Sequence, residues 1–448
     1  MITMKINSRL RLCGLPEDII KQVREELTID NPLYAEAQEK GRLTRGIPKQ
    51  LRLMKRNRDK NYYSMPRGYY YRMCELIKNH EVQIYNETVV AKLIDVSFKG
   101  KLRRDQTRGG MLINENTCGV LKAPTGGGKT VIAIWTIAKR KVPTLIVVHT
   151  KELMYQWKEK LHQFLNINSD QVGLVGDGHR NFKDITIGIV NSLAKMEIPD
   201  KYGTLIVDEC HRVPATTFAN VVEKLSTRYL LGLTATDRRS DGLDELIYRY
   251  MGGLVHEIKT KNLQESGDIL KPEVKIIETD YSYYMTNPRQ RNAMIQDMIN
   301  NADRNAIITK NIEGQVKEFP NGIALVISDR VGHCKKLQDR LQDSVLLVGN
   351  VPNSERRMVI EKLQQGISNI LIATGQLIGE GFDLPQLSSV FLTTPIKFDG
   401  KLQQIIGRIV RIAEGKEKAI IYDFSDNNWL LQHNLKSRME FYKKEGIL

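Results

Sequence analysis

The chain has 448 residues, enough for two or three domains that each bury their own core. Hydrophobic residues make up 41% and charged residues 27% of the chain, which excludes collagen-like, disordered and disulfide-rich proteins. Lysine and arginine outnumber aspartate and glutamate by 67 to 52, and this net charge of +15 favours a polyanionic partner such as nucleic acid.

The start of the chain and its cysteines bear on the cellular compartment. The first residues, MITMKINSRLRLCGLPED, lack the apolar stretch of a signal peptide, and no apolar run is long enough to span a bilayer. The five cysteines stand singly without a C-x-x-C pair, so neither a zinc ribbon nor a disulfide framework is indicated. We therefore expect a cytoplasmic protein with no membrane partner.

Residues 1–98 carry no catalytic signature and are predicted to form a small α+β domain. Pro16, Glu17 and Asp18 indicate a helix start, because apolar residues at helical spacing follow them. Between Lys40 and Arg72, eleven basic residues stand against one acid, with tyrosines interleaved at the end. Cations that neutralise phosphates, beside rings that stack on bases, are typical of a nucleic-acid surface.

The alternative interpretation of this segment is a solvated basic face above core tyrosines. The motifs further along the chain favour DNA binding. The candidate DNA contacts of the N-terminal domain are Arg52, Lys55, Arg56 and Arg67.

From about residue 100, short β-branched runs alternate with helical stretches, which is typical of parallel sheets with helices on both faces. The predicted strands of a first series are Thr144–Val148, Ile185–Val190, Thr204–Asp208 and Tyr229–Leu233, and those of a second are Ile323–Ile327, Val345–Val348, Ile370–Ala373, Val390–Leu392 and Ala419–Tyr422. Two α/β lobes are predicted, over residues 99–261 and 305–448. Residues 262–304 are polar and are predicted to be a linker.

A phosphate-binding loop is predicted where Ala123-Pro-Thr-Gly-Gly-Gly-Lys-Thr130 follows an apolar run and precedes a helix over residues 131–139. The glycines let backbone N–H groups surround phosphates at the positive end of that helix. Lys129 is expected to reach the β and γ phosphates, and Thr130 to bind Mg²⁺. The strict pattern has glycine where this chain has Ala123. The expected nucleotide-binding residues of the loop are Thr125, Gly126, Gly127, Gly128, Lys129 and Thr130.

An apolar strand over residues 204–207 ends in two carboxylates, Asp208 and Glu209, followed by Cys210 and His211. At the carboxyl edge of a strand, Asp208 can hold a metal ion while Glu209 polarises the attacking water. Two solvated acids are the alternative, but they leave the apolar strand before them unexplained. His211 by itself is more often a structural residue.

The second lobe contains Gln404-Ile-Ile-Gly-Arg408-Ile-Val-Arg411, whose two arginines are predicted to share one face of a helix. Arginine is suited to stabilising charge on a transferring phosphoryl group. A surface salt bridge is the ordinary alternative, but Gly407 and the flanking isoleucines indicate a closely packed helix at a lobe interface. Gln404, Arg408 and Arg411 are therefore catalytic candidates.

Over roughly residues 100–440, these motifs resemble those of superfamily 2 helicases. The resemblance identifies APTGGGKT as motif I, DECH as motif II, residues 232–236 as motif III, residues 373–385 as motif V and QIIGRIVR as motif VI. It implies two tandem RecA-like lobes that bind ATP and Mg²⁺ in their cleft, with Gly381 and Asp383 at the nucleotide. Arg103 and Gln106 fit the adenine-reading motif, although Asp105 stands where an aromatic residue is common. The implied contacts to the DNA backbone are Thr150, Lys151, Ser192 and Thr374.

Within the superfamily, the chain is most similar to the UvsW-like branch-migration helicases of large tailed bacteriophages. This similarity rests on the small basic N-terminal domain, on Met65-Pro-Arg-Gly68, on the DECH form and on the short C-terminus. It implies a monomeric, ATP-dependent DNA helicase that acts on forks, Holliday junctions, D-loops or R-loops in replication, recombination or repair. A phage-encoded protein of this kind works in the host bacterial cytoplasm.

Two alternatives stay open. One is a double-strand DNA translocase that uses the same core without separating strands. The sequence does not exclude it, because strand separation needs a wedge between the strands and no motif identifies one. The other is an ATP-gated protein that clamps a junction without moving.

Overall fold

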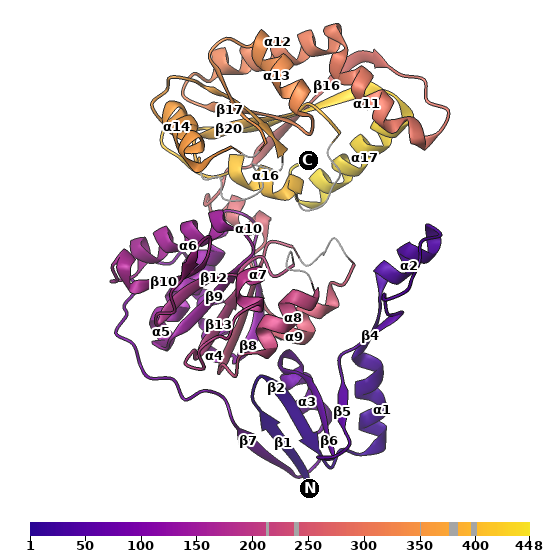
Figure 1. Cartoon of the computed structure of the whole chain (residues 1–448). Coiled ribbons are helices and arrows are strands. Elements are labelled where there is room, and N and C mark those ends of the chain that lie inside the picture. The colour runs from indigo at the N-terminus through magenta and orange to yellow at the C-terminus, as the bar shows by residue number, and fades with distance from the viewer. Residues whose placement is uncertain (212–214, 237–241, 350, 376–383, 396–400) are drawn as a thin grey trace. The chain divides into compact units, whose positions relative to one another are not determined.

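The computed structural model describes residues 1–211, 215–236, 242–349, 351–375, 384–395 and 401–448. The chain forms two compact units, one of residues 1–123 and 128–258 and the other of residues 124–127 and 259–448. The first unit holds the N-terminal domain (residues 1–98) and the first α/β lobe, and the second unit holds the other lobe (Figure 1). No helix among these residues is long and apolar enough to cross a membrane.

The N-terminal domain is built on a five-stranded mixed sheet with the order β5-β6-β2-β1-β7. Its strands are β1 (Ile2–Ile6), β2 (Arg9–Cys13), β5 (Lys55–Asn57), β6 (Tyr62–Pro66) and β7 (Val82–Asn86), and a separate pair is formed by β3 (Thr28–Asp30) and β4 (Gln50–Arg52). Its helices are α1 (Glu17–Glu26), α2 (Pro32–Glu39) and α3 (Tyr70–Leu76), with a 3₁₀ turn at Arg67–Tyr69. Helix α1 begins after Pro16, as predicted, and buries Ile19, Ile20 and Val23.

The first lobe contains an eight-stranded sheet with the order β11-β10-β12-β9-β13-β14-β8-β15, parallel except for the β10–β11 pair. Its strands are β8 (Cys118–Lys122), β9 (Thr144–Val148), β10 (Val172–Gly176), β11 (His179–Arg180), β12 (Ile185–Ile189), β13 (Thr204–Val207), β14 (Tyr229–Thr234) and β15 (Leu254–Glu257). Its helices are α4 (Arg104–Glu115), α5 (Lys129–Arg140), α6 (Lys151–Phe164), α7 (Val190–Ala194), α8 (Ala215–Glu223) and α9 (Glu245–Met251). Strands β9 and β13 are buried at every residue, as expected for a parallel sheet covered on both faces.

The N-terminal domain and the first lobe share one hydrophobic core. Leu10 and Tyr69 of the domain belong to the same buried cluster as Phe218 of α8. Arg9 on β2 forms an ion pair with Glu223 at the end of α8 and donates a hydrogen bond of 2.7 Å to the carbonyl of Leu53. The expected boundary near residue 98 therefore lies inside one compact unit, and deletion of residues 1–98 would expose buried apolar side chains of the lobe.

The second unit contains a six-stranded, fully parallel sheet with the order β16-β21-β20-β17-β19-β18. Its strands are β16 (Pro272–Ser282), β17 (Ile323–Ser328), β18 (Ser344–Leu347), β19 (Ile370–Thr374), β20 (Leu387–Leu392) and β21 (Ala419–Asn427). Its helices are α10 (Thr260–Glu265), α11 (Arg291–Asn300), α12 (Ala302–Glu318), α13 (Val331–Arg340), α14 (Asn353–Gln364), α16 (Lys401–Ile409) and α17 (Trp429–Lys444). Figure 1 shows α12 and α13 on one side of this sheet and α16 and α17 on the other. The predicted fold class, two α/β lobes preceded by a small α+β domain, is confirmed.

The structure corrects the predicted linker over residues 262–304. Most of this segment belongs to the second lobe, as β16, α11 and the start of α12. Strand β16 pairs with β21 alone, at the edge of the sheet, and its buried residues alternate irregularly with exposed ones. An edge strand keeps polar residues because part of its surface faces solvent, so a search for continuous apolar runs misses it.

Candidate functional site

The loop between β8 and α5 has the conformation that phosphate binding requires. Gly126 and Gly128 have φ values of +89° and +82°, in the left-handed region where other residues are strained. Thr125 and Gly126 form the turn of the loop, and the backbone N–H of Gly127 donates at 2.9 Å to the carbonyl of Pro124. Helix α5 begins at Lys129, so backbone N–H groups gather at its positive end.

The two residues predicted to read adenine lie against this loop. A Cβ atom at Gly128 would be 2.1 Å from Nε2 of Gln106 and 3.4 Å from a guanidinium nitrogen of Arg103. Gln106 is buried, and its Oε1 accepts a hydrogen bond of 3.0 Å from the backbone N–H of Arg103. The start of α4 is thereby packed onto the phosphate loop, which leaves room for glycine alone at position 128.

Lys129 and the carboxylates that follow β13 come together at the carboxyl edge of the first sheet. The ammonium of Lys129 donates at 2.8 Å to the carbonyl of Ala123 and lies 3.8 Å from the carboxylate of Glu209. Asp208 is 5% exposed. Its Oδ2 accepts a hydrogen bond of 2.7 Å from the indole of Trp157, and its Oδ1 accepts one of 2.9 Å from the backbone N–H of Glu209. Burial, and next the Glu209 carboxylate, raise the pKa of Asp208 to about 6.

Glu209 has an unusual backbone and connects two motifs. Its φ is +46°, a left-handed conformation that a residue with a Cβ adopts at a cost in free energy and that is frequent at functional sites. The Nδ1 atom of His211 lies 3.4 Å from the Glu209 carboxylate and 2.8 Å from the hydroxyl of Thr234. His211 thus joins the carboxylates after β13 to the end of β14, which lies within motif III.

These residues fit a nucleotide with a divalent cation. The glycine turn and the start of α5 suit phosphate oxygens, and the oxygens of Asp208 and half-buried Thr130 are hard ligands of the kind that Mg²⁺ prefers. The described part of the chain holds no cluster of three or more His, Cys, Asp or Glu that could bind a metal. Mg²⁺ is commonly held by one or two side chains together with substrate phosphates, so this donor set is sufficient.

The predicted catalytic residues of the second unit differ in their local structure. Gln404 and Arg408 are buried in α16. Arg411 does not share a helix face with Arg408, because α16 ends at Ile409. The chain leaves the helix to form a bridge between Arg411 and Ile269, and Lys416 donates at 2.6 Å to the carbonyl of Arg411. Gly381 and Asp383 lie outside the described residues.

Three of the four expected contacts to the DNA backbone from the lobes stand at element ends. Thr150 caps α6 and its hydroxyl accepts a hydrogen bond of 3.3 Å from the backbone N–H of Leu153, and Lys151 is exposed at the first position of α6. Ser192 is half-buried in α7, and Thr374 is the last residue of β19.

The N-terminal candidates divide into two groups. Arg52, Lys55 and Arg56 are exposed, and the two arginines line a pocket of about 580 Å³. Arg67 is 5% exposed and donates a hydrogen bond to the carbonyl of Arg228. Its expected role as a DNA contact is therefore corrected: the guanidinium joins the domain to the first lobe.

The sequence did not single out Trp157. It lies on α6, where its apolar spacing with Met154 and Leu161 predicts core packing, and it is indeed 1% exposed. Its partner Asp208 is 51 residues away in the chain, so no local pattern reveals the hydrogen bond.

Comparisons with known proteins agree with this geometry. Residues 77–239 match the family model "Type III restriction enzyme, res subunit", and residues 303–413 match "Helicase conserved C-terminal domain". "Putative helicase 161L" of Invertebrate iridescent virus 6 is 30% identical over 382 residues, which cover 79% of this chain and 83% of that protein.

Among solved structures, S. cerevisiae Dbp5 bound to RNA and ADP BeF3 shares the fold. Its TM-score is 0.57 at 16% identity, over 78% of this chain and 88% of Dbp5. T4 UvsW aligns over 99% of this chain and 97% of its own, at 16% identity and a TM-score of 0.46.

Proposed function

From its membership of the superfamily 2 helicases, which are ATP-dependent motors on nucleic acid, we propose that this chain unwinds or branch-migrates forked and junction DNA. The UvsW-like helicases are the relatives whose activity we propose for it. The proposal names DNA forks, Holliday junctions, D-loops or R-loops as substrates, and replication, recombination or repair as the setting.

In this proposal, the first lobe holds ATP. Lys129 and the N–H groups of the glycine turn bind the phosphates, Asp208 and Thr130 hold Mg²⁺, and Glu209 accepts a proton from the attacking water. When bound, the cation would neutralise charge on the transferring phosphoryl group. Arg408 and Arg411 complete the site from the second lobe, so that ATP binding closes the lobes and hydrolysis opens them.

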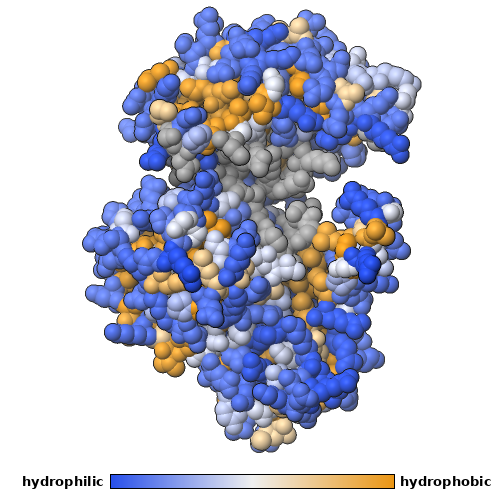
Figure 2. Space-filling view, viewed as in Figure 1, coloured by the Kyte–Doolittle hydropathy of each residue, from blue (hydrophilic) through white to orange (hydrophobic). Residues whose placement is uncertain are grey.

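The observation that carries the DNA part of the proposal is the basic pocket of the N-terminal domain. Three arginines from three elements line it: Arg24 of α1, Arg52 of β4 and Arg56 of β5. The Arg56 guanidinium lies 5.4 Å from the centroid of the Tyr63 ring, which also lines the pocket. Glu25 is the acid among the lining residues. The face of this domain seen in Figure 2 is predominantly hydrophilic.

Guanidinium groups that neutralise phosphates beside an aromatic ring are suited to nucleic acid. The domain is fused to the first lobe through a common core, so DNA held in this pocket moves with the nucleotide site. This arrangement is what a motor needs in order to hold one arm of a branch while the two lobes step along another.

The first test measures ATP hydrolysis without nucleic acid and with single strand, linear duplex, a static four-way junction and a three-way fork. We expect strong stimulation by the branched DNAs, with junction or fork product appearing alongside. Stimulation by linear duplex alone would instead identify a double-strand translocase. ATP-dependent junction affinity without any product would identify a binding protein.

A second test addresses the pocket. The double variant Arg52→Ala/Arg56→Ala is expected to bind forked DNA more weakly, whatever the base sequence of the fork. The slope of the logarithm of the binding constant against the logarithm of the salt concentration should become shallower by about two, and basal ATPase activity should be unchanged. The matched control is Lys21→Ala/Lys78→Ala, which removes two exposed charges of the same domain outside the pocket. Equal fork affinity in both double variants would remove the pocket from the proposal.

A further inference from the structure

Two exposed aromatic residues stand at the carboxyl edge of the second sheet, and we propose that they form a base-stacking platform for single-stranded nucleic acid. Tyr284, just beyond β16, is 90% exposed, and Trp429, at the start of α17, is 55% exposed. The inference rests on the proposed function in nucleic-acid binding, and it adds a contact that none of the helicase motifs contains.

The two aromatic residues leave the sheet at neighbouring positions. Strands β16 and β21 run parallel, and the pairing extends to Ser282 and Asn427. The side chain of Asn428 then donates a hydrogen bond of 2.7 Å to the carbonyl of Tyr283. Tyr284 and Trp429 each follow one residue after this bond, so both rings start from the same corner of the lobe.

The base of this corner is held firmly. The side-chain oxygen of Asn428 caps α17 by accepting hydrogen bonds of 3.0 and 3.4 Å from the backbone N–H groups of Leu430 and Leu431. Tyr281, Met294 and Leu431 belong to one buried cluster beneath it.

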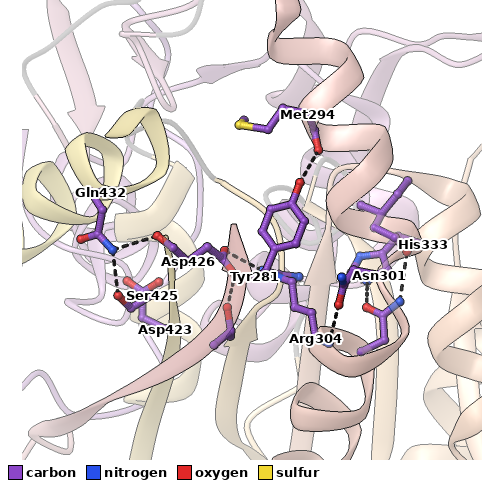
Figure 3. Close-up of polar contacts among 12 residues, drawn as sticks. Tyr281, Met294, Asn301, Arg304, His333, Asp423, Ser425, Asp426 and Gln432 are labelled. Carbon is purple, nitrogen blue, oxygen red and sulfur yellow. Dashed lines mark hydrogen bonds and ion pairs between the residues drawn. The ribbon is translucent and has the colours of Figure 1, made fainter. Parts of the chain in front are cut away.

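Polar contacts tie the same region to the sheet. Tyr281 donates to the carbonyl of Met294 at 3.1 Å, and Gln432 donates to Ser425 at 3.1 Å and to the carbonyl of Asp426 at 2.8 Å (Figure 3). The two exposed rings therefore project from an ordered support, as a stacking surface requires.

The platform lies at the same sheet edge as the expected backbone contact Thr374. All six strands are parallel, so their carboxyl ends meet at one edge. In the strand order, β19 and β21 are three strand spacings apart, roughly 14 Å across the sheet, and β21 extends three residues, roughly 10 Å, beyond the level of Thr374. A strand of nucleic acid held at Thr374 can thus reach Trp429 along this edge.

Two arginines follow Tyr284 within seven residues. Residues 283–300 contain two arginines, Arg289 and Arg291, against one acid, Asp297. Arg330, which follows β17 at the same edge, donates at 3.2 Å to the side chain of Asn292 on α11. Cations that follow a backbone next to aromatic faces are the recurring design of single-strand binding sites. This combination favours single-stranded nucleic acid over a protein partner as the occupant.

The test compares Tyr284→Ala/Trp429→Ala with Tyr284→Phe/Trp429→Phe, using a fluorescent oligothymidine and a blunt duplex. Loss of stacking on two rings is expected to weaken oligothymidine binding about tenfold or more, with little change for the duplex, and the phenylalanine pair is expected to restore most of the affinity. The control is Ile367→Ala, an exposed apolar residue just before β19, at the opposite edge of the sheet.

Wild-type affinity of the alanine pair for oligothymidine would overturn the platform, and so would an equal loss for single strand and duplex. Thermal unfolding midpoints are expected to stay unchanged, because both side chains are exposed. A wild-type protein whose ATP hydrolysis no nucleic acid stimulates would instead refute the proposed function, so the two failures are distinguishable.

Discussion

Buried carboxylates in the two units are neutralised in different ways. In the second unit, Asp426 accepts two hydrogen bonds from Arg304, of 2.7 and 3.0 Å, and Asp423 accepts two from Arg438, of 2.7 and 2.8 Å (Figure 3 shows the first pair). In the first unit, Asp208 is equally buried, but its hydrogen bonds come from the uncharged indole of Trp157 and a backbone N–H.

The difference distinguishes carboxylates that stabilise the fold from a carboxylate that is available for chemistry. A carboxylate clamped by an arginine fork has its charge compensated within the protein and holds elements together. The charge of Glu209 lies next to Asp208 and raises its pKa, and the ammonium of Lys129 lies 3.8 Å from the Glu209 carboxylate. A buried carboxylate whose pKa is raised by burial and by a second carboxylate is a mark of functional sites, and here the pair suits a divalent cation brought with the nucleotide.

The largest effect is expected from exchanging the two kinds of aspartate for asparagine. Asp426→Asn leaves the buried guanidinium of Arg304 without its counter-charge, so the free energy of unfolding should fall by about 3–5 kcal/mol. Asp208→Asn removes a carboxylate that burial disfavours, so stability should hold or rise while ATP hydrolysis falls on the order of 10²–10³-fold. Urea unfolding and steady-state ATPase assays measure both quantities.

An equal loss of stability in Asp208→Asn and Asp426→Asn would contradict the difference between the two carboxylates. In that case both carboxylates would be structural. Retention of ATPase activity by Asp208→Asn would separately remove the metal-binding assignment.

How far the sequence predicts such a site depends on how local its determinants are. The phosphate loop and the Asp208–Glu209 pair are each a continuous stretch of sequence. The residue types in each stretch and the apolar strand before it were therefore enough to predict that each follows a strand of the sheet. Arg411 was misplaced because its departure from the helix depends on Ile269, far away in the chain. Arg67 was misjudged because its burial comes from the packing of one domain against another, which charge patterning does not contain.

A smaller effect is expected from His333, a neighbour of the Arg304–Asp426 pair. Its ring nitrogens lie 3.1 Å from the hydroxyl of Ser328 and 2.9 Å from the side-chain oxygen of Asn305. Burial first, and then the charges of Arg304 and Lys336, lower the pKa of His333 to about 3. The unfolded chain has the ordinary histidine pKa near 6.5, so it binds the extra proton as the pH falls below that value.

His333 should therefore make the protein less stable as the pH falls from 6.5 towards 3, by about 2 kcal/mol at pH 5. His333→Gln should flatten this dependence between pH 7 and 5, measured as the change in unfolding free energy. His433→Gln, at an exposed position of α17, serves as the control. Identical pH profiles for the two variants would show that the pKa of His333 is not lowered in the folded protein.

The smallest effect is expected at Trp157, whose indole donates the hydrogen bond that distinguishes Asp208 from the arginine-bound carboxylates. Trp157→Phe keeps an aromatic ring in the core but removes the hydrogen bond to Oδ2 of Asp208. The carboxylate then loses one of the two donors that orient it towards the cation, whereas an arginine-clamped carboxylate would keep its charge compensation. We expect kcat for ATP hydrolysis to fall about tenfold, the equivalent of one hydrogen bond to a charged group, and the Mg²⁺ concentration at half-maximal rate to rise.

Nucleotide affinity without Mg²⁺, measured with a fluorescent ATP analogue, should be unchanged, which distinguishes loss of orientation from general damage to the site. Trp135→Phe is the matched control, because Trp135 lies half-buried on α5 beside Gly110 and Lys139, away from both carboxylates. If the two phenylalanine variants show the same Mg²⁺ dependence, Trp157 contributes packing alone. Asp208 would then be oriented by the backbone N–H of Glu209, and the cation would bind it without a contribution from α6.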